Sequence, residues 1–356
     1  MKSKYILKKI ILSVLCLSMV GLLSSCDDWT DPEGLDIKNP TIEDENNALY
    51  QEYLENLRNY KKTYHKMLIG WFDNSVKAPV SQAQHIKSVP DKVDIVSLMY
   101  GDNLTEIELA EMKSIREDKG TRVIYTIDYE TFRQEIEDKN KEIEEGNVGS
   151  DNPRDLIDLI AELPGFIDSQ LSLLEKYGYD GISINFAGKS TEFMTPAEAA
   201  EMEAIQNTIF GKLSSVMSAN PGKLYIFEGK PENVLDQKLL QSFEYIVIRT
   251  FTAPSILRLA EMTKASLVEG VPANNIIVCA MPRSTDESDT ETGTIIAPDG
   301  TIQNAITETA HWVCTPDSFT KAGLGIYRIN DDYYNADLDY KLTREAIEIM
   351  NPSPKN

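Results

Sequence analysis

Eight short apolar runs alternate with longer polar or amphipathic stretches through most of the chain. In order, the runs are Met67–Phe72, Val93–Met99, Arg122–Ile127, Gly181–Phe186, Leu224–Phe227, Tyr245–Ile248, Ile276–Ala280 and Leu324–Ile329. Buried strands separated by stretches long enough for helices are typical of parallel β/α units. In a chain of 356 residues, eight such units predict one (β/α)8 TIM barrel, an α/β fold, rather than two ordinary domains.

The segments between the runs carry recognisable helix signals. Apolar residues recur about every 3.6 positions before the fourth run, at Leu156, Ile160, Leu163, Ile167, Leu171 and Leu174. Thr195-Pro196-Ala197-Glu198 reads as a capping box that opens the next helix. A helix over Leu49–Tyr64 precedes the first run and is expected to cover the base of the barrel. The barrel is expected to span residues 47–352.

Two insertions interrupt the alternation. Glu130–Pro153 is highly charged and is expected to extend the third helix into a loop. Arg283–Thr301 is polar, contains the turn signal Pro298-Asp299-Gly300 and follows the seventh run. We therefore expect the second insertion at the barrel rim, where the sites of such folds lie.

The N-terminus has the features of a secretion signal. Basic residues precede an apolar stretch from Ile10 to Leu23, which is short for a membrane span. The stretch ends in Leu23-Ser24-Ser25-Cys26, which resembles a bacterial lipobox. By that resemblance residues 1–25 are removed, Cys26 is lipidated, and residues 26–46 form an acidic tether. A plain signal peptide is the alternative. Asp27 and Asp28 resemble export signals of surface lipoproteins, so the outer membrane, facing outward, is the expected location.

Charge and cysteine content exclude several functions. The formal net charge of −22 disfavours binding to nucleic acid. Cys279 and Cys314 are expected to be buried free thiols, although a disulfide is chemically allowed outside the cytoplasm. The three histidines are scattered, so no metal site and no cofactor are expected.

The fourth run contains the most informative motif. Residues 178–187 read Gly-Tyr-Asp-Gly-Ile-Ser-Ile-Asn-Phe-Ala. Because a strand alternates its faces, Ser183, Asn185 and Ala187 share one face, while Ile182, Ile184 and Phe186 share the other.

This stretch resembles the fourth barrel strand of glycoside hydrolase family 18, which reads Asp-Gly-x-Asp-x-Asp-x-Glu. Asp180 and Gly181 keep the frame, but Ser183, Asn185 and Ala187 stand at the three later acidic positions. In the family the final Glu protonates the glycosidic oxygen and the middle Asp holds the substrate N-acetyl group, which acts as the nucleophile. Loss of a general acid costs about 10²–10⁴ in rate. The resemblance therefore implies a glycan-processing barrel without its acid.

Other segments support and limit the resemblance, which covers most of residues 66–330. Ile69-Gly70-Trp71-Phe72 and Gly325-Ile326-Tyr327 fit strands one and eight, the latter closer to endo-β-N-acetylglucosaminidases than to chitinases. Thr126-Ile127-Asp128-Tyr129 replaces the family's Ser-x-Gly-Gly, and Val247-Ile248-Arg249-Thr250 lacks its Met-x-Tyr.

Polar and aromatic side chains at the carboxyl ends of the runs are the candidate ligand contacts, because sugars present hydroxyl edges and apolar faces. They include Trp71, with Phe72 beside it, and Asp128, Asn185, Glu228, Arg249, Tyr327, Asn330, Tyr333 and Tyr334; Tyr129 is also placed at the mouth. Core packing is the alternative for Trp71, and an internal ion pair is the alternative for Glu228 and Arg249.

The sequence favours a non-catalytic surface lipoprotein that captures N-acetylglucosamine- or mannose-containing glycans for uptake. Its expected partners are the glycan, the outer membrane and an outer-membrane glycan importer. The alternative is an active endo-glycosidase that uses Asp128 or Glu228 as a non-standard carboxylate.

Overall fold

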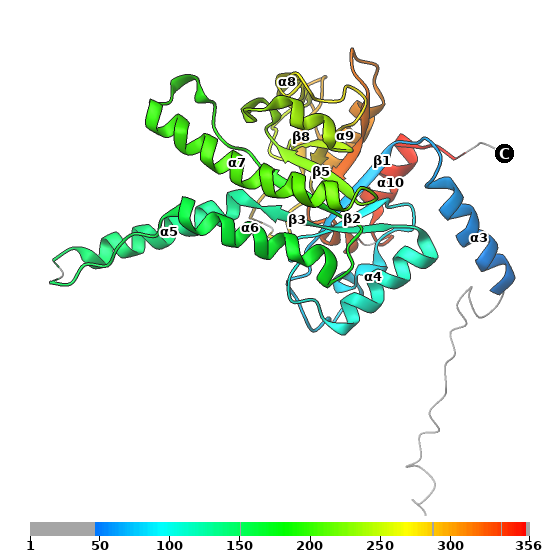
Figure 1. Ribbon diagram of the computed structural model, residues 1–356. Helices are drawn as coiled ribbons and strands as arrows, with labels where there is room; N and C mark the ends of the chain where they lie inside the picture. Colours follow the sequence, from blue (N-terminus) through cyan, green and yellow to red (C-terminus); the bar gives the residue numbers. More distant parts are fainter. Residues whose placement is uncertain (1–46, 150, 287, 336, 354–356) are drawn as a thin grey trace, which may run out of the picture. The chain divides into compact units, whose positions relative to one another are not determined.

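The computed structural model describes residues 47–149, 151–286, 288–335 and 337–353 (Figure 1). The expected signal peptide, the lipidation site Cys26 and the tether therefore lie outside the described residues. Contacts divide the chain into residues 1–52 and 53–356, and the second unit contains the barrel. In the described residues, no helix is long and apolar enough to cross a membrane.

Eight parallel strands close into a barrel in the order β1-β10-β7-β6-β5-β4-β3-β2, which confirms the predicted (β/α)8 fold. The barrel strands are β1 (Met67–Phe72), β2 (Ile95–Leu98), β3 (Arg122–Asp128), β4 (Gly181–Phe186), β5 (Leu224–Gly229), β6 (Tyr245–Ile248), β7 (Ile276–Ala280) and β10 (Lys321–Ile326). Strands β8 (Thr294–Ile296) and β9 (Ile302–Asn304) form a separate antiparallel pair within and just beyond the second insertion.

The helices are α3 (Asn47–Tyr60), α4 (Glu106–Lys119), α5 (Tyr129–Asn147), α6 (Leu159–Lys176), α7 (Pro196–Ala219), α8 (Ile256–Ala265), α9 (Ala305–Cys314) and α10 (Lys341–Met350). Short 3-10 turns are η1 (Gln82–Gln84), η2 (Ile86–Ser88), η3 (Thr191–Phe193), η4 (Pro231–Asn233), η5 (Gln237–Ser242) and η6 (Ile329–Tyr333). Helices α6 and α7 pack side by side (Figure 1).

Two helix predictions are confirmed in outline. The side chain of Thr195 accepts the backbone N–H of Glu198, so the capping box opens α7 as expected. Helix α6 buries Leu163, Ile167, Leu171 and Leu174 but begins only at Leu159. Leu156 and Ile160 are exposed, so the predicted helical repeat begins earlier than the buried face of α6. They lie before and at the helix start, where the 3.6-residue pattern no longer fixes a face.

The end of the first helix contacts the base of the barrel. Helix α3 ends at Tyr60, four residues before the predicted boundary. Lys61 Nζ donates to the Val93 carbonyl and to Thr121 Oγ1, both at 2.6 Å, and Arg58 donates to the Asp118 carbonyl at 2.7 Å. These contacts lie where β2 and β3 begin, so residues 58–61 cover part of the base.

Two apolar layers hold the barrel together. The larger lies between strands and helices and includes Ile182, Ile184 and Phe186 of β4. The smaller fills the barrel interior and includes Trp71, Ile226 and Cys279. Alternation of side chains along each strand assigns neighbouring residues to different layers. Burial on both faces explains why the strands read as nearly continuous apolar runs in the sequence.

Candidate functional site

Strand β4 turns Ser183 and Asn185 to the barrel interior, as the alternation predicts. Ser183 and Asn185 are buried, at 0% and 3% exposure, and each contacts a neighbouring strand inside the barrel. Ala187 follows the strand end, and its backbone N–H donates to Glu130 Oε1 at 2.8 Å. The inner face of this strand therefore offers a hydroxyl and an amide but no carboxylate.

Glu228 occupies the centre of the barrel mouth. Its Oε1 accepts hydrogen bonds from Trp71 Nε1 and Thr126 Oγ1, each at 3.0 Å, and from Ser183 Oγ. The side chain is buried, and this burial raises the pKa of its carboxyl group, although the charge of Arg249 and the hydrogen bonds oppose the shift. Glu228 thus belongs to a hydrogen-bonded network that spans β1, β3, β4 and β5.

A second polar cluster lies at the same end of β3, β4 and β6. Asn185 donates to Asp128 Oδ1 at 2.8 Å, and Arg249 lies 3.8 Å from Asp128 Oδ2. Asp128 Oδ1 also accepts the Thr131 N–H and so caps α5. Arg249 makes its direct ion pair with Asp128, whereas Glu228, the alternative partner, acts on it through its charge. Burial opposes the shift, but the charge of Glu228, and less strongly that of Asp128, raises the pKa of the Arg249 guanidinium.

Aromatic rings hold the arginine in place. The guanidinium lies 5.1 Å from the Phe251 ring centre and 5.2 Å from that of Tyr327. The two rings stack on each other at 4.9 Å with an angle of 14°. A planar guanidinium against stacked rings presents its donors in a fixed direction.

Of these residues, a mouth pocket of about 560 Å³ is lined by Trp71, Thr126, Asp128, Glu228, Arg249 and Tyr327. The predicted contact Asn185 does not line it and instead holds Asp128. The pocket wall also includes Tyr100, Asp102, Phe132, Glu135, Phe166 and Gln170. Phe132 and Phe166 stack face to face at 4.1 Å and are half-buried. Acceptors and donors beside apolar ring faces form the surface that a sugar requires.

The residues predicted for the barrel mouth did not include Phe132, Glu135, Phe166 and Gln170. They lie on α5 and α6 rather than at strand ends. Phe166 falls next to the apolar stripe of α6, and Phe132 stands near the start of the charged insertion. An insertion that follows a barrel strand lies on the rim, and this rule could have placed Phe132 and Glu135 near the pocket.

Several predicted contacts lie elsewhere or are hidden. Trp71 forms the pocket floor at 1% exposure, with its ring edge against Gly325, where a Cβ would lie 2.6 Å from the indole. Phe72 and Tyr129 belong to the outer apolar layer, so their predicted placement at the mouth is wrong. Phe72 faces outward by the alternation of β1, and Tyr129 is the first residue of α5.

Asn330, Tyr333 and Tyr334 do not line the mouth pocket. Asn330 Oδ1 accepts the Asp73 N–H at 3.0 Å, which fixes the backbone after β1. Tyr333 packs edge-on against Tyr340, and Tyr334 is exposed with its hydroxyl 2.9 Å from Ser81 Oγ.

Cysteines and metal ligands contribute no site in the described part of the chain. Cys279 is a buried free thiol, as predicted. Cys314 is also free but exposed, so its predicted burial is wrong. No group of three or more His, Cys, Asp or Glu among residues 47–149, 151–286, 288–335 and 337–353 is arranged to hold a metal ion.

Comparison with known proteins gives one family and several similar structures. The model of glycoside hydrolase family 18, BT1044-like, matches residues 30–349. A Glu-to-Gln variant of BT1044 is 19% identical, with 87% of this chain and 95% of that chain covered and a TM-score of 0.60. The endo-β-N-acetylglucosaminidase from Cordyceps militaris in apo form is 20% identical, with 85% and 96% covered and a TM-score of 0.55.

A doubly substituted variant of the Cordyceps militaris enzyme, in complex with fucosyl-N-acetylglucosamine-Asn, is also 20% identical, with 84% and 95% covered and a TM-score of 0.51. No curated protein matches the chain. At these identities the structural likeness establishes the fold.

Proposed function

Because the chain belongs to the BT1044-like group of glycoside hydrolase family 18, we propose that it binds an N-acetylglucosamine- or mannose-containing glycan in the mouth pocket without cleaving it. The observation that carries the proposal is the inner face of β4. Ser183, Asn185 and Ala187 stand where the family pattern has its acids, and Ala187 has no proton to donate. The protein is then a pseudoenzyme that keeps a carbohydrate site.

The pocket supplies the chemistry for binding. Its volume of about 560 Å³ lies within the range of ligand sites. Hydrogen-bonding groups for sugar hydroxyls come from Asp128, Glu135 and Gln170. The stacked rings of Phe132 and Phe166 provide an apolar surface for a sugar face. The Cordyceps militaris relative was captured with fucosyl-N-acetylglucosamine-Asn, and we propose a glycan of this class as the ligand here.

A second candidate, an endo-glycosidase with a non-standard carboxylate, rests on Glu228. Burial raises the pKa of its carboxyl group, as a general acid requires. However, its Oε1 already accepts three hydrogen bonds, and the side chain is 1% exposed. Asp128 is held by Asn185, Thr131 and Arg249. Both carboxylates are therefore better placed to shape the pocket than to transfer a proton.

Glycan retention tests the binding claim. The domain lacking residues 1–26 is titrated by calorimetry with oligomannose and complex-type N-glycans. We expect Phe132→Ala to weaken binding about tenfold, because stacking against one sugar face contributes roughly 1.4 kcal/mol. The matched control is Tyr64→Ala, which removes a ring that is 86% exposed just before β1, at the opposite end of the barrel. Equal glycan affinities of Phe132→Ala and Tyr64→Ala would show that the mouth pocket is not the glycan site.

We further propose that the protein is anchored by a lipid on Cys26 at the outer surface and delivers glycan to an outer-membrane importer. Leu23–Cys26 and the following Asp27-Asp28 support this location. Protease treatment of intact cells should remove the protein. Full protection in intact cells, together with digestion after lysis, would place it inside.

A further inference from the structure

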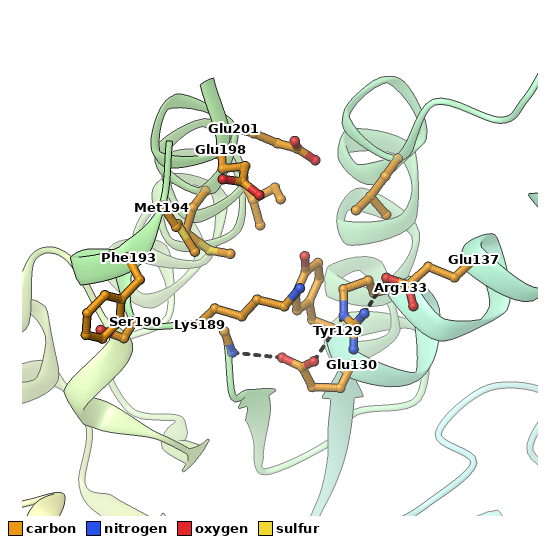
Figure 2. Close-up of a pocket in the computed structure, with 14 residues that line it drawn as sticks. Tyr129, Glu130, Arg133, Glu137, Lys189, Ser190, Phe193, Met194, Glu198 and Glu201 are labelled. Atoms are coloured by element: carbon orange, nitrogen blue, oxygen red, sulfur yellow. Dashed lines mark hydrogen bonds and ion pairs between the residues drawn. The ribbon is translucent and has the colours of Figure 1, made fainter. Parts of the chain in front are cut away.

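A second pocket of about 320 Å³ lies beside the first turn of α5, between this helix, the loop after β4 and α7 (Figure 2). Its wall combines Tyr129 and Lys189 with Glu201 of α7 and with the apolar side chains of Leu159, Met194 and Met202. It differs from the mouth pocket, which takes Thr131, Phe132 and Glu135 from the same helix. Nothing in the proposed glycan function uses this cavity.

The hydroxyl of Tyr129 has no partner among the described residues, although the side chain is 99% buried at 1% exposure. The ring packs against Phe186 at 5.5 Å, and Figure 2 shows the hydroxyl directed into the pocket. Burial raises the pKa of this phenol, with a smaller contribution from the neighbouring carboxylate of Glu130, so the hydroxyl remains protonated. Buried hydroxyls are normally satisfied, so an unpaired one facing a cavity indicates a missing polar partner.

The carboxylates around the pocket differ in availability. Glu130 and Glu137 both pair with Arg133, and Glu198 is bound to Thr195 at the start of α7. In the described chain Glu201 makes no hydrogen bond or ion pair and is exposed. Glu201 and Tyr129 line the same pocket, and after burial, the largest cause, the charge of Glu201 contributes to the raised pKa of the phenol. Among the described residues of the wall, the polar side chains without a partner are therefore the Glu201 carboxylate, the Tyr129 phenol and the Lys189 ammonium group.

We propose that this pocket binds a primary ammonium group on an unbranched aliphatic stem. The ammonium donates to the Glu201 carboxylate and to the Tyr129 oxygen, and the stem lies against Met194 and Met202. The pocket wall contains four carboxylates and two basic side chains. This excess of negative charge favours a cationic ligand over a neutral or anionic one.

Lys189 shows that such a group fits. Its side chain carries the same ammonium on a four-carbon stem, and Figure 2 shows it extending across the pocket toward Tyr129. Within the described residues it forms no ion pair, and it is exposed. Lys189 therefore competes with an incoming amine, and removing it should open the site.

Ligand-observed saturation-transfer NMR on the whole domain tests the proposal with pentylamine, its neutral analogue 1-pentanol, and acetyl-lysine-N-methylamide. We expect pentylamine to bind and pentanol not to bind. Glu201→Gln and Tyr129→Phe should each weaken pentylamine by about tenfold, since each removes a hydrogen bond to a cation. Lys189→Ala should strengthen it. Glu203→Gln, a similar exposed change on the same helix, should have no effect. The lysine derivative distinguishes a peptide side chain from a free amine as the source.

Three results would overturn the proposal. Equal binding of pentanol would make the cavity a simple apolar pocket. Equal amine affinity in Glu201→Gln and Glu203→Gln would show that the Glu201 carboxylate does not bind the amine. Absence of amine binding even in Lys189→Ala would leave the cavity without the assigned ligand. Melting curves confirm folding, and Tyr129→Phe keeps the ring that packs on Phe186.

Discussion

Arg249 contacts both the carboxylate of Asp128 and the rings of Phe251 and Tyr327 at the mouth pocket. The variant Arg249→Ala therefore tests how much these contacts contribute to stability and to glycan binding. The Arg249 side chain is 22% exposed, and its guanidinium lies 3.8 Å from Asp128, whose side chain is 31% exposed. An ion pair this open contributes about 0–1 kcal/mol. Two cation–π contacts, with Phe251 and Tyr327, add about 0.5–1 kcal/mol each. We expect a loss of roughly 1–3 kcal/mol in the free energy of unfolding.

This value is smaller than the roughly 3–5 kcal/mol expected for breaking a fully buried ion pair. The difference arises because Arg249 makes its ion pair with half-exposed Asp128 rather than with buried Glu228. The pKa of Glu228 is already raised by burial, and removing the cation raises it further. A higher pKa favours the neutral carboxyl group, which reduces the cost of losing the Arg249 charge.

Urea unfolding and calorimetric glycan titration on the same preparations provide the assay. Glycan affinity should fall by about tenfold or more in Arg249→Ala, because a charge-assisted donor is lost from the pocket wall. Arg249→Lys should retain part of the stability and less of the binding, since it keeps the charge but loses the planar stacking group. Arg258→Ala removes an arginine whose side chain is 58% exposed and should change neither quantity appreciably. A loss well above 4 kcal/mol, or unchanged glycan affinity in a folded protein, would refute this reasoning.

Three further predictions concern the same end of the barrel. Burial raises the folded-state pKa of Glu228 above 4.5, so the stability that this group contributes is complete below pH 4.5 and is lost as pH rises through the folded-state pKa. The free energy of unfolding of wild type relative to Glu228→Gln should therefore fall with rising pH. A difference that stays constant with pH would contradict the raised pKa. Trp71→Phe removes the indole N–H that contacts Glu228 and Thr126 and should cost about 1–3 kcal/mol in urea unfolding, whereas a neutral change would mean that the network does not stabilise the fold. Asn330→Ala should lower stability by about 1 kcal/mol through its lost bond to Asp73, with glycan affinity unchanged by calorimetry; weakened binding would return Asn330 to the site.

The barrel was predictable because its strands are buried on both faces. Apolar runs identified all eight barrel strands, but the last was placed three residues late. Strand β10 starts at Lys321-Ala322-Gly323, residues that carry no strand propensity. Gly325 is needed there because the Trp71 ring occupies the space that a side chain would take. Tertiary packing thus fixes this strand where local propensity does not.

The candidate site was only partly predictable, for a geometric reason. Strand alternation placed Ser183, Asn185 and Glu228 correctly inside the barrel, since a period of two is fixed by the backbone. Strand alternation does not predict which side chains at the rim contact one another. Phe132 lies on α5, inside the charged insertion, and Phe166 lies on α6, so their approach depends on how the two helices pack. Their stacking becomes visible only when α5 and α6 are in place.

The central claim is that this family 18 barrel binds glycan without hydrolysing it, and mass spectrometry of glycan after prolonged incubation tests it most directly. Oligomannose N-glycan, complex-type N-glycan and chitooligosaccharide are each incubated with protein free of contaminating hydrolase, and bound and free glycans are recovered. We expect a glycan of this class to be retained with its mass unchanged, and no oligosaccharide to be released above the buffer control. Steady release in proportion to protein concentration, abolished by Glu228→Gln or Asp128→Asn, would contradict it.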